Sequence, residues 1–387
     1  MVNPKDVLFH ELREGVRKVC DRYPSAYWRE LDAKEAYPED FVKDMMESGY
    51  LSALIPEQYG GSGLGIAEAS VILEEINHAG GNSGVCHAQM YIMGTLLRHG
   101  SEEQKERFMP GIAEGGLKFQ AFGVTEPDAG SDTLSIKTFA RKEGGRYIIN
   151  GQKIWTSRVA YSDLMLLIAR TTPKEEVKRR TEGLSAFLVD LRASVGKGVT
   201  IQPIKTMMNH HSAQVFIEDL EVPLENLIGE EGKGFYYLLD GLNAERILIA
   251  AECIGDAYWF LEKASAYASE RVVFGRPIGQ NQGVQFPIAR AYANTRAADL
   301  MRYEAAVLFD NAEPCGPEAN MAKLLSADAS FEAGNVAIQT HGGFGFAKDY
   351  DIERKFRETR LYQVAPISTN LILGYLGQHV LGMPRSY

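Results

Sequence analysis

A glutamate on an otherwise apolar helical face is the first residue of this chain with a possible chemical role. Glu245 is followed by Arg246, and the surrounding sequence has the apolar spacing of a helix. Leu238 and Leu242 precede it by seven and three residues and Ile249 follows it by four, so they share its face. Burial disfavours an ionised carboxylate. Glu245 is therefore either half of a structural ion pair with an arginine or a general base whose pKa is raised toward neutrality.

Composition limits the classes of function that this residue can serve. The 387 residues are enough for two or three domains, and 45% apolar with 24% charged residues is ordinary for a globular protein. A net charge of −10 argues against nucleic acid and anionic membranes as main partners.

Neither the N-terminus nor the apolar runs suggest export or membrane insertion. The longest apolar run, Leu164–Ala169, is too short to span a bilayer, so we expect no membrane span. The first residues lack a signal-peptide apolar region, which favours a cytoplasmic, bacterial protein. The four cysteines are widely scattered, which indicates reduced thiols and no metal site.

Along the chain, a region with helical sequence patterns is followed by one with strand patterns and then by a second helical region. We predict an α+β protein with an N-terminal helical domain (1–117), a middle β domain (118–228) of sandwich or barrel type, and a C-terminal helical bundle (229–387). The long helices of the bundle are expected over residues 234–268, 284–309, 318–339 and 368–381. The β domain is expected to contain strands at 164–169, 185–189, 200–203 and 214–217.

Three local signals refine this outline. Ser101, followed three residues later by Gln104, predicts a capping box at the start of a helix. Asn150-Gly151 predicts a hairpin turn between two strands. His210 and His211 are adjacent on a predicted strand and should point to opposite faces, so they are not expected to ligate a metal.

Three further clusters could bind a cofactor, although each also has an ordinary structural explanation. Gly123–Asp132 collects hydroxyls and small residues after a strand, which suits a phosphate-bearing planar ligand or a simple turn. Trp155-Thr156-Ser157 could form a wall beside a flavin, or the tryptophan could pack in the core. The glycine-rich turn in Gln339–Phe346 lets the backbone approach a phosphate or another chain, or ends a helix.

Together these clusters resemble the acyl-CoA dehydrogenase family nearly end to end. Residues 123–135 resemble its first signature, with Ser/Thr-Glu followed by Gly-Ser-Asp. Residues 339–358 resemble the second, Gln-x-x-Gly-Gly-x-Gly-aromatic with acidic Asp349, basic Arg354 and acidic Glu358. Arg271-x-x-Phe274-Gly275, followed by Gln282, resembles a further block, and Pro56–Gly61 resembles the N-terminal loop.

The resemblance implies a flavoprotein that oxidises an acyl-CoA thioester to the 2,3-enoyl-CoA and passes electrons to an electron-transferring flavoprotein. It also implies a homo-oligomer, either a tetramer or a dimer. Carried over by position, the residues that would contact FAD at the flavin and pyrophosphate are Phe122, Val124, Thr125, Gly130, Ser131, Trp155 and Ser157. Those that would hold its adenine half, partly from a neighbouring subunit, are Arg271, Phe274, Gln282, Gln339, Gly342 and Gly343, while Ser368 and Asn370 match further FAD-proximal positions.

The resemblance also bears on Glu245. Many family members carry the base in a C-terminal Tyr-Glu-Gly-Thr segment, but Pro366 occupies that position here and residues 361–387 contain no carboxylate. The isovaleryl-CoA and long-chain types carry it in a Leu-x-x-Glu-Arg context, which Leu242-x-x-Glu245-Arg246 matches. The resemblance therefore implies Glu245 as catalytic base, with Ser131, Leu242 and Arg246 near the substrate.

Pro366 also removes a backbone donor. In the family an amide N–H at this position helps to polarise the thioester carbonyl, and proline has none. Either the Ile367 amide donates instead, or a ribityl hydroxyl of the flavin contributes more to the polarisation of the thioester carbonyl.

Two alternatives to a dehydrogenase remain. The scaffold could serve a flavin monooxygenase or oxidase, or the chain could be a catalytically silent subunit that binds FAD or acyl-CoA. Oxygen reactivity of the reduced flavin would separate the first alternative from a dehydrogenase. Failure of every thioester to bleach the flavin would indicate the second.

Overall fold

A computed structural model describes residues 8–385, which form two compact units. The helical unit consists of residues 8–36, 65–83 and 243–385, and the sheet unit consists of residues 37–64 and 84–242. The order of elements confirms the predicted fold class, with helices before and after a β region. None of the helices within residues 8–385 is long and apolar enough to cross a membrane.

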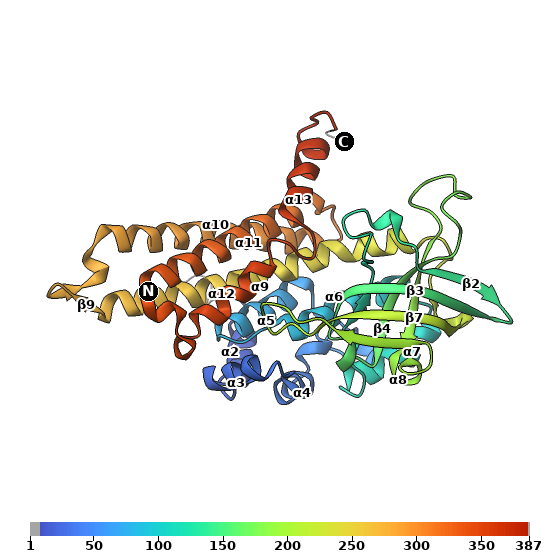
Figure 1. Ribbon diagram of the computed structural model, residues 1–387, viewed down its shortest axis with the longest axis horizontal. Helices are drawn as coiled ribbons and strands as arrows, with labels where there is room; N and C mark the ends of the chain where they lie inside the picture. Colours follow the sequence, from blue (N-terminus) through green and yellow to red (C-terminus); the bar gives the residue numbers. More distant parts are fainter. Residues whose placement is uncertain (1–7, 386–387) are drawn as a thin grey trace. The chain divides into compact units, whose positions relative to one another are not determined.

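The sheet unit is built on one eight-stranded mixed sheet (Figure 1). Its strands are β1 (Ala121–Gly123), β2 (Phe139–Glu143), β3 (Arg146–Ser157), β4 (Leu164–Arg170), β5 (Leu184–Asp190), β6 (Val199–Pro203), β7 (Ser212–Pro223) and β8 (Leu227–Ile228). The order is β6-β7-β3-β2-β4-β5-β8, with β1 pairing in parallel with β4. One face packs a continuous apolar cluster that includes Tyr147, Phe187 and Val215.

The predicted hairpin at Asn150-Gly151 is wrong. Strand β3 runs straight through these residues, and the turn that joins it to β2 is Gly144-Gly145, where both glycines have positive φ. The pairing of β3 with β7 shifts register between Ile149 and Gly151, which is a β-bulge. The extra residue of this bulge lies on β7, and Gly151 has a different role: a Cβ there would lie 2.4 Å from the Thr138 hydroxyl oxygen. An Asn-Gly pair is therefore no proof of a turn, because close approach of a neighbouring segment also requires a residue without a side chain.

The helices of the sheet unit include α4 (Glu39–Glu47), α6 (Gly84–His99), α7 (Glu102–Ala113) and the short α8 (Leu191–Ser194). The predicted capping box of α7 is confirmed: the Ser101 hydroxyl accepts from the Gln104 amide at 3.2 Å, and the Gln104 side chain accepts from the Ser101 amide at 3.0 Å. The Gln104 side chain also donates to the carbonyls of Glu225 and Leu227. The cap thus ties this helix to the segment that enters β8.

The helices of the helical unit are α2 (His10–Cys20), α3 (Ser25–Lys34), α5 (Ile66–His78), α9 (Gly234–Glu270), α10 (Gln282–Asp310), α11 (Gly316–His341), α12 (Ile352–Leu361) and α13 (Thr369–Tyr375). Helices α9, α10 and α11 match the predicted ranges within two residues at each end, whereas the helix predicted over 368–381 ends at Tyr375 and continues as a π-helix over Leu376–Val380. Helix α9 begins in the sheet unit and continues into this one. Helices α10 and α11 lie side by side, with buried alanines such as Ala298 and Ala329 allowing close approach (Figure 1). The four cysteines are free and buried, as predicted.

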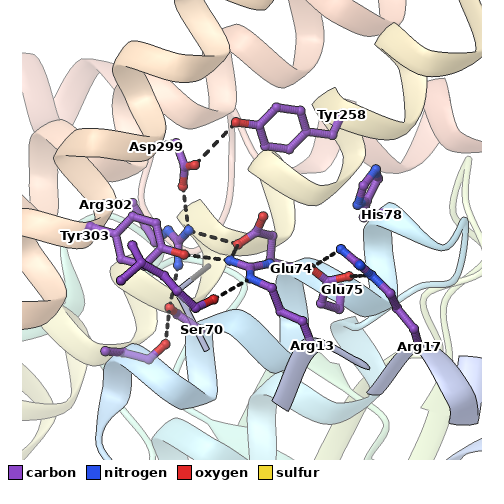
Figure 2. A network of polar contacts seen from close by, with 12 residues as sticks. Arg13, Arg17, Ser70, Glu74, Glu75, His78, Tyr258, Asp299, Arg302 and Tyr303 are labelled. Carbon is purple, nitrogen blue, oxygen red and sulfur yellow. Dashed lines mark hydrogen bonds and ion pairs between the residues drawn. The ribbon is translucent and has the colours of Figure 1, made fainter. Parts of the chain in front are cut away.

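A buried ionic network joins α2, α5 and α10 (Figure 2). The Arg302 side chain is fully buried and donates to Glu74 at 2.9 Å and to Ser70 at 2.7 Å. Arg13 from α2 donates to the same Glu74 carboxylate at 3.0 Å and to Tyr303 at 2.6 Å. Because buried charges are costly unless they are paired and hydrogen-bonded, this network fixes the relative register of the three helices.

Removing one partner of this network should destabilise the protein. Arg302→Met leaves Glu74 buried beside one cation fewer, and we expect the free energy of unfolding to fall by about 3–5 kcal/mol in denaturant titrations. The matched control is Lys34→Met, which breaks an exposed pair with Glu30 and should leave the denaturation midpoint unchanged. Equal midpoints for the two variants would contradict a structural role for the network.

Candidate active site

In the sheet unit, the segment after β1 is held by a lysine from β3. The Lys153 ammonium donates to the Val124 carbonyl at 3.0 Å, and the Ile154 amide donates to the Thr125 carbonyl at 2.9 Å. Strand β3 ends with Trp155 and Ser157. The structure therefore brings together two of the predicted cofactor clusters, 122–131 and 155–157.

The anchor of this arrangement is a buried ion pair between Lys153 and Glu126, at 2.8 Å. Glu126 also accepts from the backbone amides of Lys137 at 2.6 Å and Thr138 at 2.9 Å. Burial opposes its ionisation, but Lys153 and these donors outweigh that effect and hold the pKa of Glu126 below its ordinary value. Burial lowers the pKa of Lys153 to about 8.

This ion pair was not predicted from the sequence. Glu126 lies inside the first signature, but Lys153 stands among polar and apolar residues at the end of β3, so no local signal identified it as the partner.

The predicted flavin-side residues present an open surface of mixed character. Trp155 has positive φ and exposes 55% of its side chain, so it is not packed in the core. Gly130 and Ser131 are exposed, and Phe122, Val124, Thr125 and Ser157 are half-buried. An exposed indole beside backbone and hydroxyl groups suits a planar polar ligand.

His210 and His211 do not lie on a strand, contrary to the prediction. They precede β7, which begins at Ser212, and His211 has positive φ. The Arg158 guanidinium donates to Nδ1 of His210 at 3.4 Å. Burial, followed by the charge of Arg158, lowers the pKa of His210 well below its ordinary value, so this imidazole is neutral.

In the helical unit, α9 carries Glu245 with 5% of its surface exposed. Ile249, one turn further along, is equally buried, as the apolar spacing predicted. Arg246 is half-buried and donates to the Asn243 side chain at 2.8 Å; burial lowers its pKa, while the charge of Glu245 raises it. Leu242, one turn before Glu245 on the same helix, is half-buried.

The predicted adenine-side residues lie on exposed turns at one end of the helical unit. Phe274 exposes its whole side chain between β9 (Val272–Val273) and β10 (Arg276–Pro277), and Arg271 and Gln282 flank this hairpin. Tyr267 stacks on His341 with ring centroids 4.3 Å apart, which joins the end of α9 to the end of α11. The exposed residues Gln339, Gly342 and Gly343 therefore belong to the same end as Arg271.

Ser368 and Asn370 lie elsewhere in the helical unit. Ser368 caps α13, accepting from the Leu371 amide at 3.4 Å, and the preceding Ile367 carbonyl contacts Lys323 of α11 at 2.7 Å. Lys323 and Gln339 are sixteen residues apart on one helix, or about 24 Å along its axis. The structure therefore does not bring the 339–343 turn and the 367–370 segment together within one chain.

The charged residues of the second signature serve an internal network. Arg354 donates to Glu358 at 3.0 Å, to Asp351 at 3.2 Å and to the Gly80 carbonyl at 2.9 Å. Asp349 is exposed, and Asp351 is the aspartate that pairs with Arg354. These charges hold α12 against the turn after α5.

Comparisons with known proteins agree over most of the described chain. Family models for the N-terminal, middle and C-terminal domains of acyl-CoA dehydrogenases match residues 9–116, 121–220 and 232–369. The chain is 35% identical over 379 residues to acyl-CoA dehydrogenase fadE12 of Mycobacterium bovis, covering 97% of this chain and 96% of that one.

Two solved structures have the same fold. A glutaryl-coenzyme A dehydrogenase in complex with glutaryl-CoA has a TM-score of 0.90 at 29% identity, covering 97% of this chain and 96% of that one. A prolyl acyl carrier protein oxidase, AnaB, has a TM-score of 0.89 at 26% identity, covering 99% of this chain and 100% of that one.

Breaking the Lys153–Glu126 pair should destabilise the sheet unit and weaken cofactor retention. Lys153→Met leaves a buried carboxylate without its cation, which should cost about 3–5 kcal/mol of unfolding free energy. The double variant Lys153→Met, Glu126→Gln removes the uncompensated charge and should recover part of this loss. Thermal denaturation with and without FAD measures both effects; an additive loss in the double variant would show that the two residues are not coupled.

Proposed function

Because this chain belongs to the acyl-CoA dehydrogenase family, and is thereby an FAD-dependent oxidoreductase, we propose that it oxidises an acyl-CoA thioester to the 2,3-enoyl-CoA with Glu245 as base. The observation that carries this proposal is the burial of Glu245 on α9 in a chain without a carboxylate in residues 361–387. A carboxylate in apolar surroundings is a stronger base than one in water. When bound, FAD would supply the acceptor for the β-hydrogen, and a Glu245 carboxylate oxygen would take the α-proton.

Each unit exposes aromatic side chains or open backbone to which FAD could bind. In the sheet unit the exposed Trp155 stands beside the segment fixed by Lys153 and Glu126. In the helical unit Phe274 is wholly exposed, and a Cβ added at Gly342 or Gly343 would meet no atom within 4 Å, so the backbone there is open to a ligand. We propose the predicted contacts as the FAD site, with Ser131, Leu242 and Arg246 near the acyl-CoA.

The proposed base can be tested by anaerobic titration of the FAD-loaded protein with a panel of acyl-CoAs. Wild type should be bleached by one class of acyl chain, and Glu245→Gln should not be bleached, although the ligand should still perturb its flavin spectrum. Glu252→Gln is the matched control, because Glu252 is another buried glutamate of α9, exposing 1% of its surface. This control should bleach; bleaching of Glu245→Gln would place the base elsewhere.

The same titration separates the alternatives. The fold similarity to the acyl carrier protein oxidase AnaB favours testing an oxidase directly. A dehydrogenase that passes electrons to an electron-transferring flavoprotein should react slowly with oxygen once reduced and quickly with that partner. Rapid reoxidation by oxygen would indicate an oxidase or monooxygenase, and no bleaching of wild type by any thioester would indicate a binding subunit.

We further propose that the chain assembles into a homo-oligomer through α10. Exposed apolar residues recur on this helix every seven positions, namely Phe286, Ala293, Leu300 and Val307. Phe286, Leu300 and Val307 expose 56%, 65% and 53% of their surfaces. A seven-residue apolar repeat is the pattern that helices use to pack against one another, and a second copy offers the same stripe.

A charge on this stripe should dissociate the oligomer. Phe286→Glu combined with Leu300→Glu places two carboxylates in the proposed contact, and light scattering should show a lower molar mass than for wild type. The control, Val195→Glu, adds one carboxylate at an exposed apolar site of the sheet unit and should leave the mass unchanged. An unchanged mass in the double variant would exclude this face.

A further inference from the structure

Lys323 is a buried lysine of α11 that takes no direct part in the proposed dehydrogenation. Its side chain is fully buried in the helical unit. Within residues 8–385, its ammonium makes one hydrogen bond, to the Ile367 carbonyl at 2.7 Å, and forms no salt bridge. A buried ammonium is costly, and one neutral acceptor offsets only part of that cost.

The charges that face Lys323 come from two helices. Burial is the main cause that lowers the pKa of Lys323 to about 8, and the charge of Arg246 adds to this lowering. Cys253, Asp328 and Glu245 raise this pKa but do not offset the burial. Cys253, Arg246 and Glu245 lie on α9, and Asp328 lies on α11. The ammonium therefore lies within electrostatic reach of the proposed base and of the arginine beside it.

The turn that Lys323 contacts lies between α12 and α13. Val364 and Ala365 donate their amides to the Leu361 carbonyl, and the Ser368 hydroxyl caps α13. Pro366 has no amide hydrogen, so Ile367 carries the first backbone donor after it. In the described part of the chain, the Ile367 amide donates to no acceptor.

We propose that Lys323 is a positioning residue: by holding the Ile367 carbonyl, it fixes the turn so that the Ile367 amide donates to the thioester carbonyl oxygen of the substrate. This inference rests on the proposed acyl-CoA dehydrogenation. The anchored carbonyl and the helix cap at Ser368 restrict the backbone on the C-terminal side of Ile367. On its N-terminal side, the ring of Pro366 restricts the chain. A preorganised donor of this kind stabilises the negative charge that develops on the thioester oxygen when Glu245 removes the α-proton.

The charge state of Lys323 should make the activity depend on pH. Below pH 8 the ammonium holds the carbonyl with a charge-assisted hydrogen bond, and above it the neutral amine holds it less strongly. Activity should therefore fall as pH rises through about 8, while the protein stays folded. Arginine keeps its charge at these pH values, so an arginine in this place should remove that alkaline limb.

The experiment compares wild type with Lys323→Met and Lys323→Arg as FAD-loaded proteins, using the acyl-CoA that bleaches wild type. Lys323→Met should lose on the order of 100-fold in kcat at pH 7 with little change in KM, and its alkaline limb should disappear. Lys323→Arg should recover most of kcat and should lack the fall in activity above pH 8, because its charge does not change there. Hydrogen exchange provides the second readout: the peptide covering residues 361–370 should exchange faster in Lys323→Met than in the other two proteins.

The matched control is Lys355→Met, which removes another fully buried lysine of the helical unit, one that pairs with Asp256 at 2.5 Å. It should lower the melting temperature and leave the alkaline limb in place. Retention of kcat and of the limb in Lys323→Met, or a loss of kcat matched by lost FAD, would overturn the inference. These results differ from a failure of the proposed function, in which wild type itself is not bleached.

Discussion

Two lysines with buried ammonium groups hold the loops on which the candidate site depends. Lys153 donates to the Val124 carbonyl in the sheet unit, and Lys323 donates to the Ile367 carbonyl in the helical unit. Each places a positive charge in an interior where it is costly, and in each the pKa is lowered to about 8 by burial. A loop that is held by a buried charge has fewer alternative conformations than one held by solvent-exposed contacts, which suits groups that must meet a ligand in one geometry.

The two lysines differ in how their charge is compensated. Lys153 forms an ion pair with Glu126, and the Glu126 carboxylate also accepts hydrogen bonds from two backbone amides. The charge of Lys153 is therefore neutralised by its partner. Lys323 has a carbonyl as its contact and only more distant charges around it. The first arrangement is that of a structural anchor. The second leaves a net charge near Glu245 and Arg246, where a proton is to be moved.

The sequence predicted those features that depend on local pattern. The capping box at Ser101, the long helices and the burial of Glu245 all follow from periodicity and from residue types that act within one turn. Asn150-Gly151 failed as a turn signal because β3 stays paired with β2 and β7 there, and the glycine is required by the close approach of Thr138. The partners Glu126–Lys153 and Lys323–Ile367 are 27 and 44 residues apart, and no local pattern indicates which distant carbonyl a lysine will meet.

The length of α11 has a consequence for the thermodynamics of the assembled protein. Its two ends separate the 339–343 turn from the 367–370 segment by about 24 Å, so an FAD that engaged both sets would draw them from different chains. FAD binding and subunit association would then be thermodynamically linked, so that each would favour the other. Dilution would release FAD, and excess FAD would oppose dissociation of the subunits. The holoprotein's melting temperature would therefore rise with protein concentration.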